Sequence, residues 1–353
     1  MIVVMRAGAP REHIEAVEAH LTELGYTVNP IYGAVKTVIG AVGAADHEKL
    51  DAAEALRAHE GVEDVVLVSK PYKFVAKEAN ALGKSQIDLG DGVIIGGDQA
   101  VMMAGPCTVE SEEQLFTTAE AVARAGATIL RGGAYKPSTS PYSFHGMGEP
   151  GLKMLREAAD RYGMKVITEA MHVRKVEEVS QYADVLQIGT RNMQNYELLR
   201  EVGQSRVPVM LKRGMTSKYE EWLLAAEYIA AGGNENIMLC ERGVRTFETY
   251  TRNTLDIGAV PVLASLTHLP VIIDPSQGTG RRDLVGAMCR AGLAAGADGL
   301  IVEVHPNPDH AIKDGAQSVT IANFEEMMPG LIRIAEAVDR PLAMNSRSQA
   351  VPA

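Results

Sequence analysis

Cysteine is scarce in this sequence, which contains only Cys107, Cys240 and Cys289, with no paired spacing among them. Such a chain has no disulfide framework, and its thiols suit a reducing compartment. The first six residues do not resemble a signal peptide, because their positive charge follows the apolar residues instead of preceding them. We therefore expect a cytoplasmic protein.

Positive charge is also in deficit, since 34 Lys and Arg stand against 45 Asp and Glu and give a formal net charge of -11. This balance argues against nucleic acid and against an anionic membrane surface as partners. No apolar run reaches the ~18 residues that a membrane-spanning helix needs. Any anion-binding site in this chain must therefore be a local cluster of cations.

The composition is otherwise that of a globular protein, and 353 residues are enough for one large and one small domain. Residues 1–75 predict the small domain, with elements in the order strand, helix, strand, strand, helix, strand. The predicted elements are Ile2–Met5, Arg11–Leu24, Thr27–Tyr32, Thr37–Val42, His47–His59 and Val62–Val68. This order is that of a ferredoxin-like module. Such a module can bind a small ligand, pair with a copy of itself or serve as a structural cap, and the pattern alone does not separate these roles.

Residues 76–99 are expected to form a linker and a hairpin. The hairpin is predicted over Ile87–Ile95, where Gly90-Asp91-Gly92 supplies the turn. Its position just before the large domain suggests that it plugs the bottom of that domain.

Residues 100–340 alternate apolar strands with amphipathic helices. The predicted strands are Ala100–Ala104, Ala127–Leu130, Lys165–Thr168, Val185–Ile188, Pro208–Leu211, Ile237–Leu239, Pro270–Ile273 and Gly299–Val302. Eight strands with helical connections over about 240 residues predict a (β/α)8 TIM barrel, an α/β fold. A doubly wound open sheet is the competing architecture, but its first strand would end in a glycine-rich phosphate loop rather than in Gly105-Pro-Cys107. Residues 341–353 are predicted to be a flexible tail.

The carboxyl ends of the predicted strands are rich in charge. Six cations follow them, namely Arg131, Lys136, Arg191, Lys212, Arg213 and Arg242. Because active sites of such barrels lie at these ends, the cations are expected to gather on one rim and to bind phosphate groups. Any single one of them could instead form a structural ion pair with an acidic neighbour. The segment after Lys136, from Pro137 to Ser140, adds hydroxyl groups and has the composition of a loop shaped around a phosphate.

Cys107, Glu303 and Asp314 suggest a metal site. A thiolate and two carboxylates on neighbouring strands could hold a divalent transition metal. Alternatively, a lone cysteine after Gly-Pro is a small buried apolar residue.

Several motifs together resemble 3-deoxy-D-arabino-heptulosonate 7-phosphate (DAHP) synthase, in the class with a short barrel and an N-terminal ferredoxin-like regulatory domain. They are Ala104-Gly-Pro-Cys-Thr-Val-Glu110, Leu130-Arg-Gly-Gly-Ala-Tyr-Lys-Pro137, Ile188-Gly-Thr-Arg-Asn192, Leu211-Lys-Arg-Gly214, Cys240-Glu-Arg-Gly243, Asp274-Pro-Ser276 and Val302-Glu-Val-His-Pro306. The resemblance covers nearly the whole chain. It implies condensation of phosphoenolpyruvate with erythrose 4-phosphate, the first step of the shikimate pathway.

The resemblance also implies roles for single residues. Phosphoenolpyruvate is expected on Arg131, Lys136, Arg191, Lys212 and Arg242, and erythrose 4-phosphate on Pro137, Ser138, Thr139 and Ser140. Catalytic roles are expected for Lys136, Arg131, Glu169 and Asp274. A divalent transition metal (Mn, Co, Zn or Fe) is expected on Cys107, Gln277, Glu303 and Asp314.

Two positions depart from the family pattern. Ser138 stands where the family has an arginine that binds the aldose phosphate, and Gln277 stands where it has a histidine that ligates the metal. The chain could thus be a DAHP synthase with an altered metal site, a related synthase for another aldehyde, or a catalytically weak regulatory homologue. The retained cations, Cys107, Glu303 and Asp314 argue against the third of these, and we rank the three in the order given. For residues 1–75 the resemblance implies feedback inhibition by an aromatic amino acid within a homotetramer.

Overall fold

The computed structural model describes residues 1–32, 36–43, 48–67, 70–80, 83–136 and 142–348. The chain divides into two compact units, Met1–Lys73 and Phe74–Ala353. Each unit has its own core, and each is described by itself below. None of the described helices is long and apolar enough to cross a membrane.

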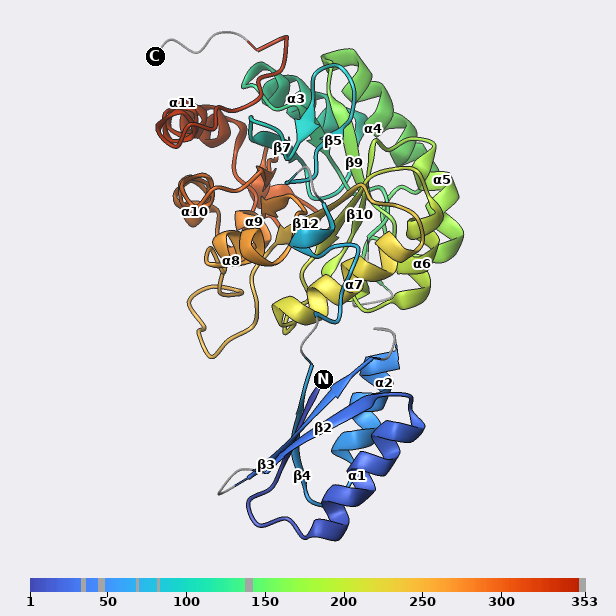
Figure 1. The fold of residues 1–353 in the computed structure, drawn as a ribbon. Helices are drawn as coiled ribbons and strands as arrows, with labels where there is room; N and C mark the ends of the chain where they lie inside the picture. Colours follow the sequence, from blue (N-terminus) through green and yellow to red (C-terminus); the bar gives the residue numbers. More distant parts are fainter. Residues whose placement is uncertain (33–35, 44–47, 68–69, 81–82, 137–141, 349–353) are drawn as a thin grey trace. The chain divides into compact units, whose positions relative to one another are not determined.

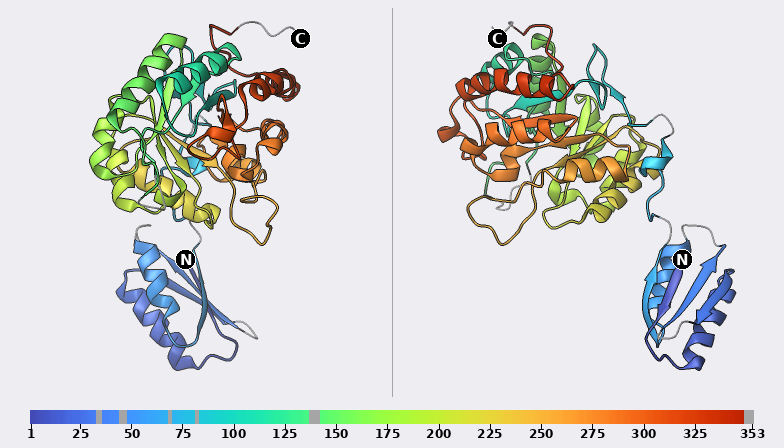
Figure 2. Two further views of the ribbon diagram at one scale, coloured as in Figure 1. Left: turned by 180° about the vertical axis from the view of Figure 1, so that it is seen from behind. Right: turned by 60° about the vertical axis from the view of Figure 1, so that its left-hand side comes forward.

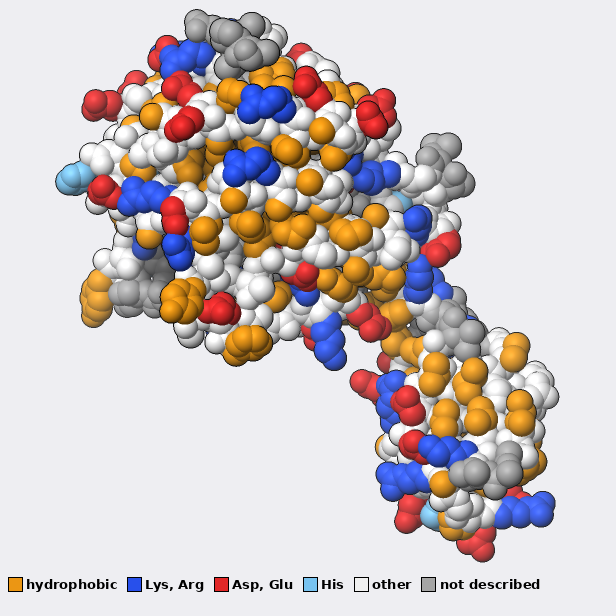
Figure 3. All heavy atoms as spheres, turned by 90° about the vertical axis from the view of Figure 1, so that its left-hand side faces the viewer, with side chains coloured by type: hydrophobic (Ala, Val, Ile, Leu, Met, Phe, Trp, Pro, Cys, Tyr) orange, Lys and Arg blue, Asp and Glu red, His pale blue; other side chains and the backbone are white. Residues whose placement is uncertain are grey.

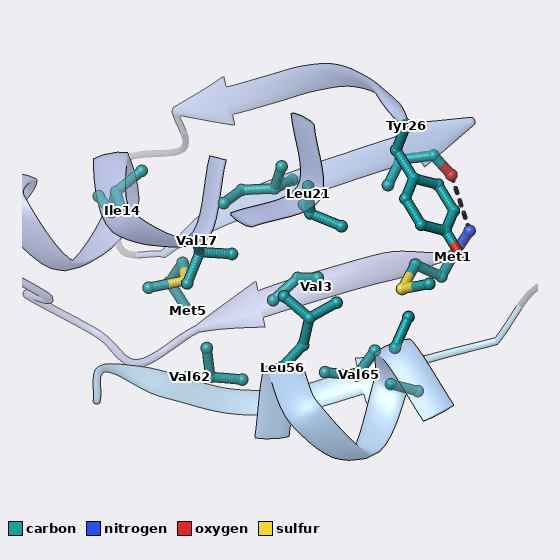
Figure 4. Close-up of a cluster of buried hydrophobic side chains, with 14 residues drawn as sticks. Met1, Val3, Met5, Ile14, Val17, Leu21, Tyr26, Leu56, Val62 and Val65 are labelled. Atoms are coloured by element: carbon teal, nitrogen blue, oxygen red, sulfur yellow. Dashed lines mark hydrogen bonds between the residues drawn. The ribbon is translucent and has the colours of Figure 1, made fainter. Parts of the chain in front are cut away.

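The N-terminal unit is a four-stranded antiparallel sheet with two helices on one face (Figure 1). Its elements are β1 (Ile2–Met5), α1 (Arg11–Glu23), β2 (Thr27–Tyr32), β3 (Thr37–Val42), α2 (Glu48–Arg57) and β4 (Val62–Val66). The strand order is β2-β3-β1-β4, so the predicted ferredoxin-like fold is confirmed. Helix α1 buries Ile14, Val17 and Leu21 because their spacing of three and four residues places them on one face. Figure 4 shows these three side chains in the same cluster as Val3 and Met5 of β1.

The opposite face of this sheet is apolar and exposed. Ile31, Val42 and Val66 are 66%, 65% and 45% exposed. Figure 3 shows hydrophobic side chains gathered on the surface of this unit. The alternation of strand side chains explains the pattern, since Ile39 and Ala41 of β3 are buried while Val42 is exposed.

The second unit is a closed barrel of eight parallel strands, which confirms the predicted TIM barrel. The strands are β7 (Val101–Gly105), β8 (Ile129–Arg131), β9 (Lys165–Glu169), β10 (Val185–Ile188), β11 (Val209–Lys212), β12 (Ile237–Glu241), β13 (Val271–Ile273) and β14 (Gly299–Glu303). Figures 1 and 2 show the helices arranged outside the strands. They are α3 (Glu112–Arg124), α4 (Glu149–Tyr162), α5 (Val176–Ser180), α6 (Tyr196–Gln204), α7 (Tyr219–Ala231), α8 (Ala259–Leu266), α9 (Pro275–Thr279), α10 (Arg282–Ala294) and α11 (Ile321–Ala337). Short 3-10 turns cover Lys77–Ala79, Val173–Lys175, Thr190–Asn192 and Pro308–His310.

The end of the barrel where the strands begin is closed by the hairpin of β5 (Ile87–Asp88) and β6 (Ile94–Ile95). Ile87, Val93 and Ile95 share one buried cluster with side chains of all eight barrel strands. The expectation that this hairpin plugs the barrel is therefore confirmed.

The C-terminal segment differs from the expectation of a flexible tail, at least over its first residues. Ala100 donates its amide to Pro341, and Ala343 donates to Ala100. Ala343 and Asn345 are buried, and the Asn345 side-chain amide donates to three backbone carbonyls. The composition of the segment gave no sign of these contacts, because they depend on partners more than 180 residues away in the chain.

Phe74, Val75 and Ser85 are hydrogen-bonded to side chains of the barrel. Both oxygens of the Glu227 carboxylate accept from the chain, one from the Phe74 amide and one from the Val75 amide, each at 3.0 Å. His268 donates from Nε2 to the Phe74 carbonyl at 2.7 Å and accepts at Nδ1 from the Ser85 hydroxyl at 2.8 Å. Thr267 donates to the Val75 carbonyl. These contacts make the start of the second unit a fixed part of the barrel.

Candidate active site

A polar cavity of about 190 Å³ lies where the barrel strands end. Four of the predicted substrate-binding cations line it, and they are Lys136, Arg191, Lys212 and Arg242. Glu169 at the end of β9 and Gln277 and Asp314 in later loops line it as well. The structure thus brings the chemistry of at least five strand ends and loops to one opening.

Arg242 follows β12 and is buried, yet it forms no ion pair with any residue that the structure describes. Its one hydrogen bond is from Nη1 to the carbonyl of Gly243 at 3.3 Å, and its Nε has no partner in the described part of the chain. Burial lowers the pKa of this guanidinium from its ordinary value. A buried cation without an anionic partner is costly, so the site is arranged to receive an anion from outside the chain.

Lys136 is buried beside the cavity and donates from Nζ to the Cys107 carbonyl at 2.8 Å. Its position depends on Gly133, because a Cβ atom there would lie 2.7 Å from Lys136 Cδ and 2.8 Å from its Nζ. The glycine therefore makes room for the lysine side chain.

Lys212 and Asp274 form a buried ion pair with Nζ and Oδ2 2.6 Å apart. The other carboxylate oxygen of Asp274 accepts from the Gln277 amide at 2.9 Å and caps the start of α9. Asp274 thus holds the lysine at the cavity and fixes the turn that carries Gln277.

Arg131 lies at the end of β8, and its Nη1 is 3.0 Å from Oε1 of Glu303. Both side chains are buried, and Arg131 is absent from the side chains that line the cavity. Apart from this ion pair, Nε and Nη1 of Arg131 and Oε1 of Glu303 have no partner among the described residues. The pair therefore retains donors for a substrate anion and an acceptor for a metal.

Cys107, Glu303 and Asp314 each offer a ligand atom, and these atoms lie within 4.8 Å of one another. In the part of the chain that the structure describes, this is the one such group of three. The Cys107 thiol donates to Oδ2 of Asp314 at 3.3 Å. Burial raises the pKa of Cys107 to about 12. A soft thiolate with two hard carboxylates fits a divalent transition metal, and Oε1 of Glu303 has no partner besides Arg131 among the described residues.

Asp314 occupies the left-handed region of the backbone, with φ at 53°. Non-glycine residues are uncommon in this region, which makes the local conformation specific to this loop. Burial acts to raise the pKa of Asp314, but the thiol donor of Cys107 and the positive charges of Arg252 and Lys136 lower it below its ordinary value. The carboxylate therefore stays charged near the predicted metal position.

Gln317 connects this predicted metal position to a further cation. Its Nε2 donates to Oε2 of Glu303 at 2.8 Å, and its Oε1 accepts from Nη1 of Arg252 at 2.9 Å. Arg252 also donates to Oδ1 of Asp314 at 3.2 Å. Two of the three grouped ligands are thus held by the same pair of side chains.

Glu169 lies at the end of β9 and is buried at the cavity wall. Gln187 donates to its Oε2 at 3.5 Å, and a Cβ atom on Gly189 would lie only 2.1 Å from its Oε1. The glycine therefore leaves space that the carboxylate occupies.

One expectation about this rim needs correction. Arg213 was expected among the phosphate-binding cations, but its Nη1 contacts Glu241 at 2.8 Å and Asp256 at 2.9 Å, and it does not line the cavity. Arg213 therefore forms structural ion pairs instead of facing the cavity. His305, which follows β14, does not join the predicted metal ligands, because its Nε2 lies 3.2 Å from Oε2 of Glu110. The predicted residues Pro137, Ser138, Thr139 and Ser140 lie outside the described residues.

Sequence reasoning missed Gln187, Arg252, Lys313 and Gln317. Gln187 lies within a strand, and the other three follow their strand by ten or more residues. A signal was present in the barrel fold itself, because the loops that follow strands form the rim. Reading whole loops rather than strand ends would have included Arg252, Lys313 and Gln317, whereas Gln187 gives no such signal because it lies inside β10.

Comparisons with known proteins agree with this arrangement. Residues 75–340 match the model of the DAHP synthetase I family, and residues 1–70 match that of the DAHP synthase ferredoxin-like domain. A phospho-2-dehydro-3-deoxyheptonate aldolase of Thermotoga maritima is 48% identical over 338 residues, covering 96% of this chain and 98% of the relative. A 2-dehydro-3-deoxyphosphooctonate aldolase of Desulfosudis oleivorans is 30% identical over 71% of this chain and 96% of the relative.

Solved structures show the same relationship. The crystal structure of the DAHP synthase of Thermotoga maritima superposes with a TM-score of 0.91 at 46% identity, covering 97% of this chain and 98% of that one. A truncated form of 3-deoxy-D-arabino-heptulosonate 7-phosphate synthase from the same organism covers 76% of this chain and 98% of its own, with a TM-score of 0.71 at 48% identity.

Proposed function

The chain belongs to the DAHP synthetase I family, and from that membership we propose how its cavity condenses phosphoenolpyruvate with erythrose 4-phosphate. The reaction yields DAHP and inorganic phosphate and is the first step of the shikimate pathway. The observation that carries the proposal is the buried Arg242 without an acidic partner among the described residues, beside Lys136, Arg191 and Lys212 in one cavity. Phosphoenolpyruvate has a phosphate and a carboxylate, and both would be bound by charge-assisted hydrogen bonds.

In this proposal Arg191, Lys212 and Arg242 hold phosphoenolpyruvate, and Arg131 adds the donors that Glu303 does not use. Lys136 is placed to reach both substrates, because it lines the cavity and its Nζ donates to the carbonyl of Cys107, a predicted metal ligand. Asp274 keeps Lys212 in position. Binding in a cavity fixes the enol carbon for attack and keeps water from hydrolysing the substrate early.

Cys107, Glu303 and Asp314 would hold a divalent transition metal (Mn, Co, Zn or Fe), and Gln277 lines the same cavity and offers an amide oxygen. When bound, such a metal supplies Lewis-acid polarisation of the aldehyde carbonyl. Gln277 is neutral, so it binds a soft transition ion more weakly than an imidazole would.

The bonds change in two stages. The enol carbon of phosphoenolpyruvate forms a bond to the aldehyde carbon, and Lys136 can give a proton to the oxygen that becomes a hydroxyl. Water then adds to the carbon that carries the phosphate, and Glu169 is the buried carboxylate at the cavity wall that can accept its proton. Phosphate leaves when the bond between that carbon and the phosphate oxygen breaks, and the added hydroxyl becomes the ketone as its proton passes to the departing phosphate. The segment Pro137–Ser140 is proposed to meet erythrose 4-phosphate.

We propose that the N-terminal unit binds an aromatic amino acid such as tyrosine or phenylalanine and that the chain forms a homotetramer. The exposed apolar face with Ile31, Val42 and Val66 supports pairing of this unit with a copy of itself. A cytoplasmic location is proposed as well, because the three free cysteines stay reduced there. Tyrosine and phenylalanine should therefore change the melting temperature or the activity of the full chain.

The proposed function is tested by phosphate release from phosphoenolpyruvate with a panel of aldose phosphates, with and without Mn²⁺, Co²⁺ or Zn²⁺. Release with erythrose 4-phosphate is expected. Arg242→Gln should raise KM for phosphoenolpyruvate by about tenfold or more, because a charged hydrogen bond is worth roughly 1.5–3 kcal/mol. No release with erythrose 4-phosphate under any metal would refute the proposal.

A further inference from the structure

Two cations line the cavity in addition to those proposed for phosphoenolpyruvate. Arg252 lies in the loop between β12 and α8, and Lys313 lies between the Pro308–His310 turn and α11. Asp314 and Gln277 line the same cavity, so these cations share it with the predicted metal position.

Arg252 is held in place from one side. Its Nη1 donates to Asp314 and to Gln317, and its backbone amide donates to the Thr279 carbonyl at 2.8 Å. Gly280 leaves the space for it, because a Cβ atom there would lie 2.4 Å from Arg252 Cβ. A guanidinium has five N–H donors, and the hydrogen bonds to described side chains use only Nη1. The side chain is 47% exposed, and its remaining donors are available to an anion.

Lys313 has no hydrogen bond or ion pair with any other residue that the structure describes, and it is partly buried at the cavity. Its neighbour Asp314 is already engaged by Cys107 and Arg252. A partly buried ammonium with no protein partner at the wall of a substrate cavity is suited to a ligand anion.

The phosphate of erythrose 4-phosphate needs positively charged partners. The segment Pro137–Pro141 after Lys136 contains no lysine or arginine, so it offers hydroxyls and backbone amides only. Neutral donors to phosphate are roughly half as strong as charged ones. The cations proposed for phosphoenolpyruvate already face two anionic groups of that substrate.

We propose that Arg252 and Lys313 bind the phosphate of the aldose substrate. This inference rests on the proposed function and names a part of the same cavity. The aldehyde end of the aldose then lies toward Cys107, Glu303 and Asp314, and its phosphate lies on the adjoining wall. Gln317 is a positioning residue in this arrangement, because it orients Arg252 and Glu303 together.

The test compares erythrose 4-phosphate with erythrose, which lacks the phosphate, as partners of phosphoenolpyruvate. Lys313→Gln should lower kcat/KM for erythrose 4-phosphate about tenfold or more and leave kcat/KM for erythrose within twofold. KM for phosphoenolpyruvate should also stay within twofold. Lys153→Gln removes a lysine on the outer face of α4 and should change none of these values.

Variants of Arg252 give a second test. Arg252→Gln should cause a similar selective loss, and Arg252→Lys should recover part of it, with the metal content of each variant measured because Arg252 also contacts Asp314. Inhibition by erythritol 4-phosphate, which has the phosphate but no aldehyde, gives a measure independent of turnover. Its inhibition constant should rise about tenfold in Lys313→Gln.

Equal losses with erythrose and erythrose 4-phosphate, or an unchanged inhibition constant for erythritol 4-phosphate, would overturn the inference. In either case turnover of erythrose 4-phosphate by the unaltered chain would leave the proposed function standing. Absence of that turnover would instead refute the proposed function itself.

Discussion

Gly133 offers a direct test of how the cavity is built. In Gly133→Ala the new methyl group would lie 2.7 Å from Lys136 Cδ, 2.8 Å from Lys136 Nζ and 2.9 Å from the Cys107 carbonyl. Ordinary van der Waals contact begins at 3.4 Å, so Cδ is 0.7 Å and Nζ is 0.6 Å too close. The lysine side chain can rotate away from the new methyl group, whereas the contact with the Cys107 carbonyl requires a small backbone shift as well.

The size of the effect follows from that displacement. A misplacement of about 1 Å at a reacting group costs on the order of 10²-fold in rate, so Gly133→Ala should lower kcat/KM by about 10- to 100-fold. The position has no positive φ, so alanine meets no backbone strain there. Crowding of a packed region costs about 1–3 kcal/mol, and part of this is offset by the lower entropy of the unfolded chain. We expect a loss of at most ~2 kcal/mol in unfolding free energy.

Phosphate release measured over a range of substrate concentrations gives kcat/KM, and urea unfolding of the same preparations gives the unfolding free energy. Gly286→Ala is the matched control, because it lies in α10 and its nearest neighbour would be 3.8 Å from the new Cβ atom. This control should keep full activity and gain roughly 0.5–1 kcal/mol of stability. If Gly133→Ala keeps kcat/KM within twofold of the unaltered chain, Lys136 does not need its present position and the assigned role is wrong.

Three further outcomes follow from the structure. Burial raises the pKa of Cys107 to about 12, so metal binding must release the thiol proton. The affinity for Zn²⁺, measured by chelator competition, should therefore rise about tenfold per pH unit near neutrality. Cys107→Ser should abolish this slope. Nε2 of His59 lies 2.6 Å from Nδ1 of His20. Burial, and after it the charge of His20, lowers the pKa of His59. The unfolded chain therefore binds more protons just below pH ~6.5, and the free energy of unfolding should fall as the pH drops through that range. Calorimetry of the full chain should show a shallower decline in His59→Gln, and an identical decline would contradict the assignment. Asn345→Ala leaves three carbonyls without their donor and should cost ~2–3 kcal/mol in urea unfolding, whereas no change would mean that water replaces the amide.

The fold could be read from the sequence because its signals are local. Each barrel strand is a short apolar run between amphipathic helices, and the structure places every one of the eight within two residues of its predicted bounds. The helix α3 begins after Ser111, whose side chain accepts from the Gln114 amide at 3.1 Å. A helix cap can be predicted from the sequence because its donor and acceptor lie within three residues of each other.

The details of the site could be predicted only in part. Cys107, Glu303 and Asp314 were grouped correctly in space, because barrel closure brings the first and last strands together. An internal ion pair was left open for every one of the six cations, but the sequence did not show that Arg213 is the one that forms it with Glu241 and Asp256 instead of facing the cavity. The burial of Asn345 was missed, since it depends on partners far away in the chain. A cation at a strand end has the same sequence signature whether it meets a substrate or an internal carboxylate.

The hydrogen bonds that hold the start of the second unit bear on how the chain can be re-engineered. They join Phe74 and Val75 to Glu227, Thr267 and His268. All of these bonds lie within the second unit, so a chain that starts at Phe74 retains every donor and acceptor that secures its beginning. The junction before Phe74 is therefore a natural splice point, at which a different sensor module could be joined to the same catalytic body.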